Sequence, residues 1–188
     1  MSDTPADDDL PRLVARCLRG DEAALTAYVR RFERAVFGLC LRMLGDRQEA
    51  EDVAQETFVR AVRNLDKWEP RRPMMPWLQT IAANRCRTAL GKRPRRAKPA
   101  ASLPELSYSP KMPDDTADLI EDCVGQLPPD WQAAVRLFYL EGFACGRIAE
   151  TLGCAEGTVK TWLFRGRKRL AKLLLERGVG CSAEGGAA

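Results

Sequence analysis

Basic side chains gather in two blocks of the 188-residue chain, and their chemistry is that of contact with a polyanion. Residues 61–98 hold 11 Lys and Arg against 2 Asp and Glu, and residues 159–177 hold 7 bases against 1 acid. Acidic stretches alternate with these blocks, so the net charge is only +4. Because Lys and Arg displace the counterions of phosphates, two such blocks indicate salt-sensitive binding to nucleic acid. Two solvated helix faces are the alternative interpretation.

The second basic block overlaps residues 144–168, which have the pattern of a helix-turn-helix. Ile148 and Leu152 are the inner residues of its first helix, and Gly153 suits the turn because glycine adopts a positive φ at little cost. A second helix with an exposed basic side fits the DNA major groove, where its first residues read base edges and later ones contact phosphates. We expect its buried side to hold Val159, Leu163 and Leu170. Its outward residues are Thr158, Thr161, Arg165, Lys168, Arg169 and Lys172. An ordinary helical hairpin is the alternative.

Helices must position these side chains, because apolar residues recur at spacings of three and four. Sustained alternation of apolar and polar residues, which would indicate strands, is absent. The first half predicts helices over about 21–44, 46–65 and 77–90, with Asp21 and Asp46 as N-caps. In the second of these helices, carboxylates cluster on the side opposite the apolar stripe. That cluster is either solvated or a docking face for a basic partner.

The third predicted helix places Trp77 and Ile81 inward and carries a polar face at i, i+4 and i+7, formed by Thr80, Asn84 and Arg87. In the second half, the pattern predicts four helices, at about 116–126, from Pro128 onward, at 145–152 and at 156–176. Leu140 is expected to point inward from the second of these. Four prolines in residues 97–115 and a lack of periodicity there indicate a linker between these halves.

We therefore predict an all-α fold of two small helical domains joined by a flexible linker, the second domain containing the helix-turn-helix. The predicted parts are an acidic tail at 1–9, a helical domain at 10–96, the linker at 97–115, the helix-turn-helix domain at 116–176 and a disordered tail at 177–188.

Composition removes most enzyme classes. The chain has no histidine, which excludes Ser-His-Asp and Cys-His catalysis and histidine zinc sites, and it has no glycine-rich phosphate loop. We therefore expect no enzyme activity, cofactor or metal. The seven cysteines form no C-x-x-C pair, and Cys40, Cys86 and Cys123 fall on apolar stripes, so packed, reduced thiols are expected. A redox or metal-sensing role is the alternative.

The chain is expected to be cytoplasmic and not inserted in a membrane. No apolar run reaches the roughly 18–20 residues of a membrane span. The first nine residues hold four aspartates and no base, whereas a secretory signal needs a basic start and an apolar stretch.

Motifs along the chain resemble one known family in order and spacing. They are Gly20-Asp21-Glu22-Ala23-Ala24, Ala50 to Phe58 (AEDVAQETF), Trp77-Leu78 with Ile81-Ala82-Ala83-Asn84, Leu127-Pro128-Pro129, Leu140-Glu141-Gly142, Ile148-Ala149-Glu150, Leu152-Gly153, Gly157-Thr158-Val159-Lys160 and Arg165-Gly166-Arg167-Lys168. Together they resemble the extracytoplasmic-function sigma factors, sigma-70-related subunits of bacterial RNA polymerase, over about residues 10–175. The resemblance implies a sigma factor that directs core polymerase to promoters.

The resemblance also implies a role for each candidate surface. Core polymerase, through its β′ clamp and its β flap, would be the protein partner. The residues implied to bind polymerase are Glu49, Asp52, Gln55 and Glu56. Those implied to bind the melted minus-ten element are Trp68, Arg71, Arg72, Thr80, Asn84, Arg87, Lys92 and Arg93. Those implied to bind the minus-35 duplex are Thr158, Lys160, Thr161, Arg165, Lys168 and Arg169. An anti-sigma protein is a family expectation.

Several observations leave choices open. Trp68 fits either the edge of the core or base stacking. Ala155 stands where the family usually has a capping residue, Trp162 where a DNA-contacting arginine is common, and Gly166 where alanine is common. Two other functions are weighed: a helix-turn-helix regulator that works without polymerase, and an interaction adaptor that does not bind DNA.

Overall fold

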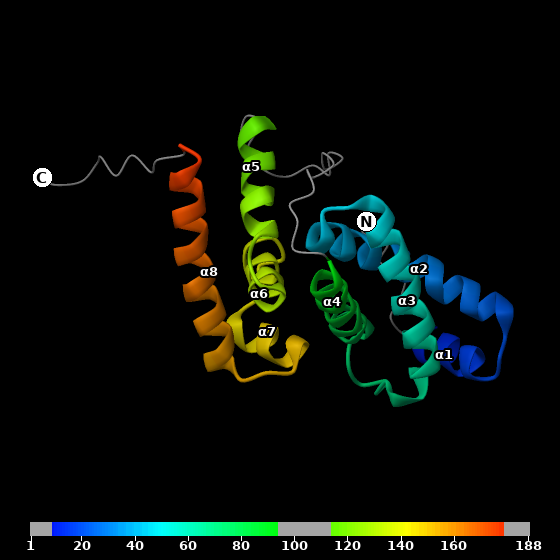
Figure 1. Ribbon diagram of the computed structural model, residues 1–188. Coiled ribbons are helices and arrows are strands. Elements are labelled where there is room, and N and C mark those ends of the chain that lie inside the picture. The colour runs from blue at the N-terminus through cyan, green and yellow to red at the C-terminus, as the bar shows by residue number, and fades with distance from the viewer. Residues whose placement is uncertain (1–8, 94–113, 179–188) are drawn as a thin grey trace, which may run out of the picture. The chain divides into compact units, whose positions relative to one another are not determined.

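The structure is a computed structural model that describes residues 9–93 and 114–178, and the regular elements in these ranges are all helices (Figure 1). They form two compact units that divide between Cys86 and Arg87. The all-α prediction with two helical domains is therefore confirmed. The predicted linker and both tails lie almost wholly outside the described residues, and the predicted domain boundaries stay a prediction.

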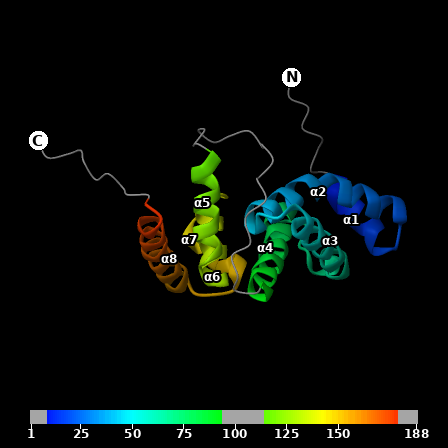
Figure 2. The ribbon, with the colours of Figure 1, turned by 45° about the horizontal axis from the view of Figure 1, so that its top comes forward.

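The first unit is built around one long helix. Its elements are α1 (Leu10–Leu18), α2 (Glu22–Leu44), α3 (Arg47–Arg63), the 3₁₀ turn η2 (Leu65–Lys67) and most of α4 (Met74–Lys92). Helix α2 packs against both α1 and α3, as Figures 1 and 2 show, and η2 contacts α1 and α3.

Local sequence signals set the ends of α2 and α3. The Asp21 carboxylate accepts a hydrogen bond from the Ala24 N–H at 3.0 Å, which caps α2. Gly45 ends that helix with φ of 69°, a conformation in which a side chain would be strained. The Asp46 carboxylate then accepts from the Glu49 N–H at 2.8 Å and caps α3. A two-residue link thus makes α2 and α3 a helical hairpin.

The core of the first unit forms where α2, α3 and α4 meet. Tyr28 is fully buried, its ring meets Phe58 edge to face, and its hydroxyl donates to the Met74 sulfur at 3.6 Å. The predicted apolar stripe of α3 is buried as expected. It consists of Ala50, Ala54, Thr57, Phe58, Ala61 and, on η2, Leu65.

Helix α4 departs from prediction in where it begins and in which residues it buries. It starts at Met74, three residues before Trp77, so Pro76 occupies its first turn, where proline is tolerated. Its buried side holds Met74, Leu78, Ala82, Ala83 and Cys86, whereas Trp77 and Ile81 are half-buried. The inward placement of Trp77 and Ile81 was wrong because the i, i+4 row from Met74 to Cys86 faces the core and puts both on its flank.

The second unit packs three helices against a fourth. Its elements are α5 (Asp114–Gly125), α6 (Pro129–Tyr139), α7 (Cys145–Leu152) and α8 (Glu156–Glu176). Helix α8 contacts α5, α6 and α7, and α6 also contacts α7. Helices α7 and α8 form the predicted helix-turn-helix, with Gly153 between them at φ of 67° and with Ile148, Leu152 and Val159 buried.

Two residues of this unit are placed differently from the prediction. Leu140 is 49% exposed, because α6 ends at Tyr139, and Leu137 fills the core position instead. Leu170 is only half-buried, and Leu173, one turn later on α8, is buried.

The interior of α6 is also more polar than expected. Arg136 is buried in an ion pair with Glu121, and the Gln132 side chain donates to the Leu127 carbonyl at 2.8 Å. Buried polar groups of this kind need partners.

The cysteines on the apolar stripes are packed in the core, as predicted. Cys40, Cys86 and Cys123 are fully buried. A hydrogen bond with Cys40, together with burial, raises the pKa of the Cys86 thiol, and burial raises the pKa of the Cys123 thiol. These thiols therefore stay protonated at neutral pH. Cys181 lies outside the described residues.

Candidate nucleic-acid and protein interfaces

One face of α3 presents the carboxylates and amide implied to bind polymerase. Asp52, Gln55 and Glu56 are exposed and lie within one turn of one another, while Glu49, one turn earlier, is half-buried. Asp52 makes no ion pair or hydrogen bond within the described part of the chain, so its carboxylate is open to a partner. The structure therefore brings all four predicted residues to one helix, with three of them accessible.

Glu56 differs from Asp52 because it already has a partner in the same unit. The Arg85 guanidinium of α4 lies 3.0 Å from Glu56 Oε2 through its terminal nitrogen, and Arg85 Nε donates to the same oxygen at 3.2 Å. Sequence reasoning missed Arg85, since 29 residues separate the two and no periodicity within one helix could join them.

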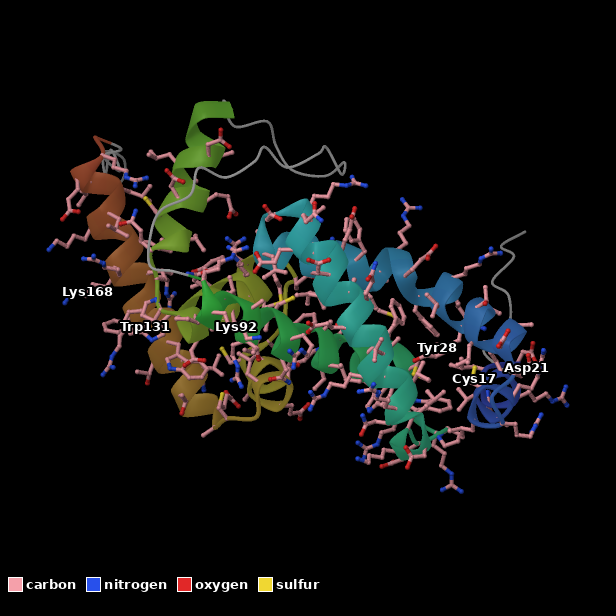
Figure 3. The ribbon with its side chains drawn as sticks, turned by 45° about the vertical axis from the view of Figure 1, so that its right-hand side comes forward. Cys17, Asp21, Tyr28, Lys92, Trp131 and Lys168 are labelled. Atoms are coloured by element: carbon pink, nitrogen blue, oxygen red, sulfur yellow. The ribbon has the colours of Figure 1, made fainter. Side chains whose placement is uncertain are left out.

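The residues implied to hold melted DNA lie on α4 and on the loop before it. Thr80 and Asn84 are half-buried, and their side chains bond back to the carbonyls one turn earlier, Thr80 to Pro76 and Asn84 to Thr80, each at 2.9 Å. Arg87 and Arg93 are half-buried, and Lys92 is exposed near the end of the helix, where Figure 3 labels it. The predicted i, i+4, i+7 face of Thr80, Asn84 and Arg87 is thus present.

The loop before α4 is organised by a tryptophan. The Trp68 ring is 7% exposed, and its indole nitrogen donates to the Arg72 carbonyl at 3.1 Å. The structure thus favours the edge of the core for Trp68 rather than stacking on a base. Arg71 and Arg72 are exposed, and Arg72 pairs with Glu69 at 3.0 Å. Trp68 therefore shapes a loop that presents the two arginines.

The outer face of α8 carries the expected basic residues. Arg165, Lys168 and Arg169 are exposed and form no ion pair with any described residue, and Lys168 projects outward in Figure 3. Thr161 is exposed and bonds to the Gly157 carbonyl at 2.9 Å, while Thr158 is half-buried. Lys160 instead pairs with Glu156 at 2.7 Å, and this hydrogen bond raises the pKa of its ammonium group. Five of the six predicted side chains thus have no charged partner among the residues that the structure describes.

Two unusual residues of α8 have structural consequences. Ala155 is the N-cap residue and provides no side-chain hydrogen bond to the helix start. Gly166 is buried, and a Cβ there would lie 3.1 Å from Val135 Cγ2 of α6. Glycine therefore lets α6 and α8 approach closely.

Phe164 is a further exposed residue of α8 that apolar patterning cannot assign. Its side chain is 64% exposed, although a phenylalanine in an amphipathic helix is normally expected in the core. Its position in the sequence, between the buried Leu163 and the exposed Arg165, places it beside the basic face. An aromatic side chain therefore adjoins the basic face.

Within residues 9–93 and 114–178, no group of three or more Cys, Asp or Glu side chains is arranged to hold a metal ion. Over the same residues, no helix is long and apolar enough to cross a membrane.

The two units match two described families in the same order as the predicted domains. Residues 28–96 match Sigma-70 region 2, and residues 117–170 match Sigma-70, region 4. The RNA polymerase sigma-H factor of Pseudomonas aeruginosa is 32% identical over 87% of this chain and 92% of its own length. The ECF RNA polymerase sigma factor SigW of Bacillus subtilis is 30% identical over 88% of this chain and 96% of its own.

Solved structures agree with the fold. CnrH, solved in complex with the cytosolic domain of CnrY, aligns with a TM-score of 0.59 at 24% identity, over 91% of this chain and 99% of that one. The sigma factor RpoE, solved in complex with the anti-sigma factor NepR from Bartonella quintana, aligns with a TM-score of 0.56 at 24% identity, over 80% and 96% of the two chains.

The regular elements of the described residues are all helices, with a basic helix-turn-helix in the second unit and an acidic helix face in the first. These are features of a DNA-binding protein with a protein partner. The matches over most of the chain are more specific. The chain belongs to the extracytoplasmic-function family of sigma-70-related factors, which direct bacterial RNA polymerase to promoters.

Proposed function

We propose that this sigma factor binds core polymerase through the acidic face of α3 and binds promoter DNA through α4, the loop before it and α8. Support comes above all from Asp52, an exposed carboxylate with no partner of its own within the described residues, flanked by Gln55 and Glu56. Such a face is complementary to a basic protein surface, and the β′ clamp is the proposed contact. The β flap is proposed to contact the second unit.

The DNA contacts divide by chemistry. Arg71, Arg72 and Lys92 are exposed cations that can neutralise the phosphates of a melted strand, and Thr80 and Asn84 add polar groups beside them. The exposed face of α8 is proposed to enter the major groove of the minus-35 duplex, with Thr158 and Thr161 near base edges and Arg165, Lys168 and Arg169 at phosphates. Because these actions concern bacterial polymerase, the proposed location is the cytoplasm.

Charge reversal at Asp52 tests the polymerase contact. We expect Asp52→Lys to weaken binding to purified core polymerase by about tenfold or more, because a like charge would face the basic partner. The substitution is on an exposed helix face, so unfolding free energy should change by only about 0.5 kcal/mol. The measurement is a fluorescence titration of labelled sigma factor with core enzyme, with urea unfolding in parallel.

Glu33→Lys is the matched control, since Glu33 is an exposed carboxylate of α2 in the same unit and outside the proposed face. If Asp52→Lys and Glu33→Lys bind core enzyme equally well, the α3 contact is wrong. A promoter mobility shift separates the rival functions: a polymerase-independent regulator shifts promoter DNA alone, and an adaptor gives no shift with or without core enzyme.

An anti-sigma protein is proposed as the regulator. Support comes from RpoE, a protein of similar fold that was solved in complex with the anti-sigma factor NepR. Such a partner would compete with core polymerase in the same titration.

A further inference from the structure

The ion pair between α3 and α4 leaves half of the Glu56 carboxylate unused. Two nitrogens of the Arg85 guanidinium contact Oε2, at 3.0 and 3.2 Å. Oε1 has no partner within the described residues. Each carboxylate oxygen can accept about two hydrogen bonds, so Oε1 keeps its full capacity.

Arg85 is the more firmly held member of the pair. Its side chain is 23% exposed, whereas that of Glu56 is 59% exposed. A half-buried guanidinium has less freedom to move than an exposed carboxylate, and here two of its nitrogens converge on one oxygen, Oε2. The pair therefore restrains the Glu56 rotamer while the carboxylate stays open to a partner.

We propose that Arg85 is a positioning residue that holds Glu56 ready for core polymerase, an inference that rests on the proposed function. Because Arg85 contacts Oε2 alone, Oε1 stays available to a basic partner while the pair is intact. A free glutamate loses rotamer freedom on binding, whereas Glu56 is already ordered. Asp52, one turn earlier on the same face, has no such support.

The test is binding of full-length variants to purified core polymerase by fluorescence titration. We expect Arg85→Gln to weaken binding about three- to tenfold, the range for immobilising one flexible side chain. Arg85→Lys, which keeps the charge and one contact, should recover part of the loss. In a Glu56→Gln background, Arg85→Gln should change affinity by less than about twofold, because the two residues act as one unit.

Arg47→Gln is the matched control. It removes the same charge from an exposed ion pair on α3, that of Arg47 with Glu51 at 3.0 Å, and neither residue is among the four proposed to bind polymerase. We expect it to leave polymerase affinity unchanged. Urea unfolding of every variant reports on folding, and Arg85→Lys keeps the test informative if Arg85→Gln is unstable.

Three results would overturn the inference. They are Arg85→Gln binding as tightly as the parent or more tightly, an equal loss in the Glu56→Gln background, and a loss in Arg47→Gln as large as in Arg85→Gln. Failure of the parent protein to bind core polymerase would instead refute the proposed function, which is a distinguishable outcome.

Discussion

Asp21 makes two kinds of contact at the start of α2. Its carboxylate caps the helix at the Ala24 N–H and accepts a hydrogen bond from Arg16 Nε at 2.8 Å. The bond from Arg16 and then that from Ala24 lower the pKa of Asp21 below its ordinary value. The charged form is therefore favoured in the folded chain. Its contribution to stability is present above the ordinary pKa and is lost as the pH falls through the lowered value.

Asp21→Asn isolates the charge, because asparagine caps a helix about as well as aspartate. We expect the variant to unfold at lower urea than the parent at pH 7, and we expect this difference to shrink below about pH 4 as Asp21 becomes protonated. Urea midpoints measured between pH 7 and pH 3 check it. A difference that stays constant over this range would show that the charge is not the cause.

Residues with nearby partners could be predicted from sequence, and residues with distant partners could not. Asp21, Asp46 and Gly153 act on backbone within a few residues, so their roles follow from spacing alone. Arg85 pairs with a residue on another helix, and no spacing rule reaches that far. Trp68 left two alternatives open because burial depends on how the loop before α4 packs.

At the scale of the element, Gly166 lowers the helix propensity of α8 but allows α8 to pack closely against α6. Alanine is favoured over glycine inside a helix by about 1 kcal/mol. A Cβ at this position would, however, lie 3.1 Å from Val135 Cγ2, which is tighter than ordinary contact. The mid-helix glycine alone indicates only a cost in helix propensity, and the close approach of α6 explains its place.

A double-mutant cycle tests this account. We expect Gly166→Ala to stabilise a Val135→Ala protein by up to about 1 kcal/mol and to stabilise the parent less, with a coupling of about 0.5 kcal/mol or more. Unfolding in urea measures both. Gly157→Ala is the control, because a Cβ there meets nothing within 4 Å and its effect should not depend on Val135. Equal gains from Gly166→Ala in both backgrounds would contradict steric crowding.

The period of the apolar residues predicts the helix ranges well, but it predicts less accurately which residues of a helix are buried. Helices α2, α7 and α8 begin and end where spacing and caps predict. The apolar pattern of α6 predicts Leu140 to point inward, yet the helix ends one residue earlier and Leu140 is exposed. Trp77 and Ile81 likewise lie at the edge of a face whose centre depends on where α4 starts.

At the scale of the molecule, two units proposed to bind two DNA elements would gain affinity from being part of one chain. Once one element is bound, the other surface binds as an intramolecular step with a raised effective concentration. The order of the two matched families, residues 28–96 before 117–170, agrees with the two halves that the sequence predicts. The exact contacts with DNA could not be predicted, because they depend on the partner.

A variant with Arg165, Lys168 and Arg169 all replaced by glutamine tests the role of α8. We expect the polymerase complex to lose about tenfold or more in promoter affinity and to show a salt slope reduced by about 0.9 for each lost phosphate contact. Because phosphate contacts carry no sequence information, we expect a similar loss on a promoter whose minus-35 element is scrambled. No loss on either promoter would show that this face of α8 does not contact DNA.

The fully buried thiols can be used to measure how often each unit opens locally. Cys40 and Cys86 sit inside the first unit and Cys123 inside the second, so an alkylating reagent can reach each only when the surrounding helices separate. The rate at which each thiol is modified would therefore measure how often the unit that contains it opens. A slower rate in the complex with polymerase would show which unit the enzyme stabilises.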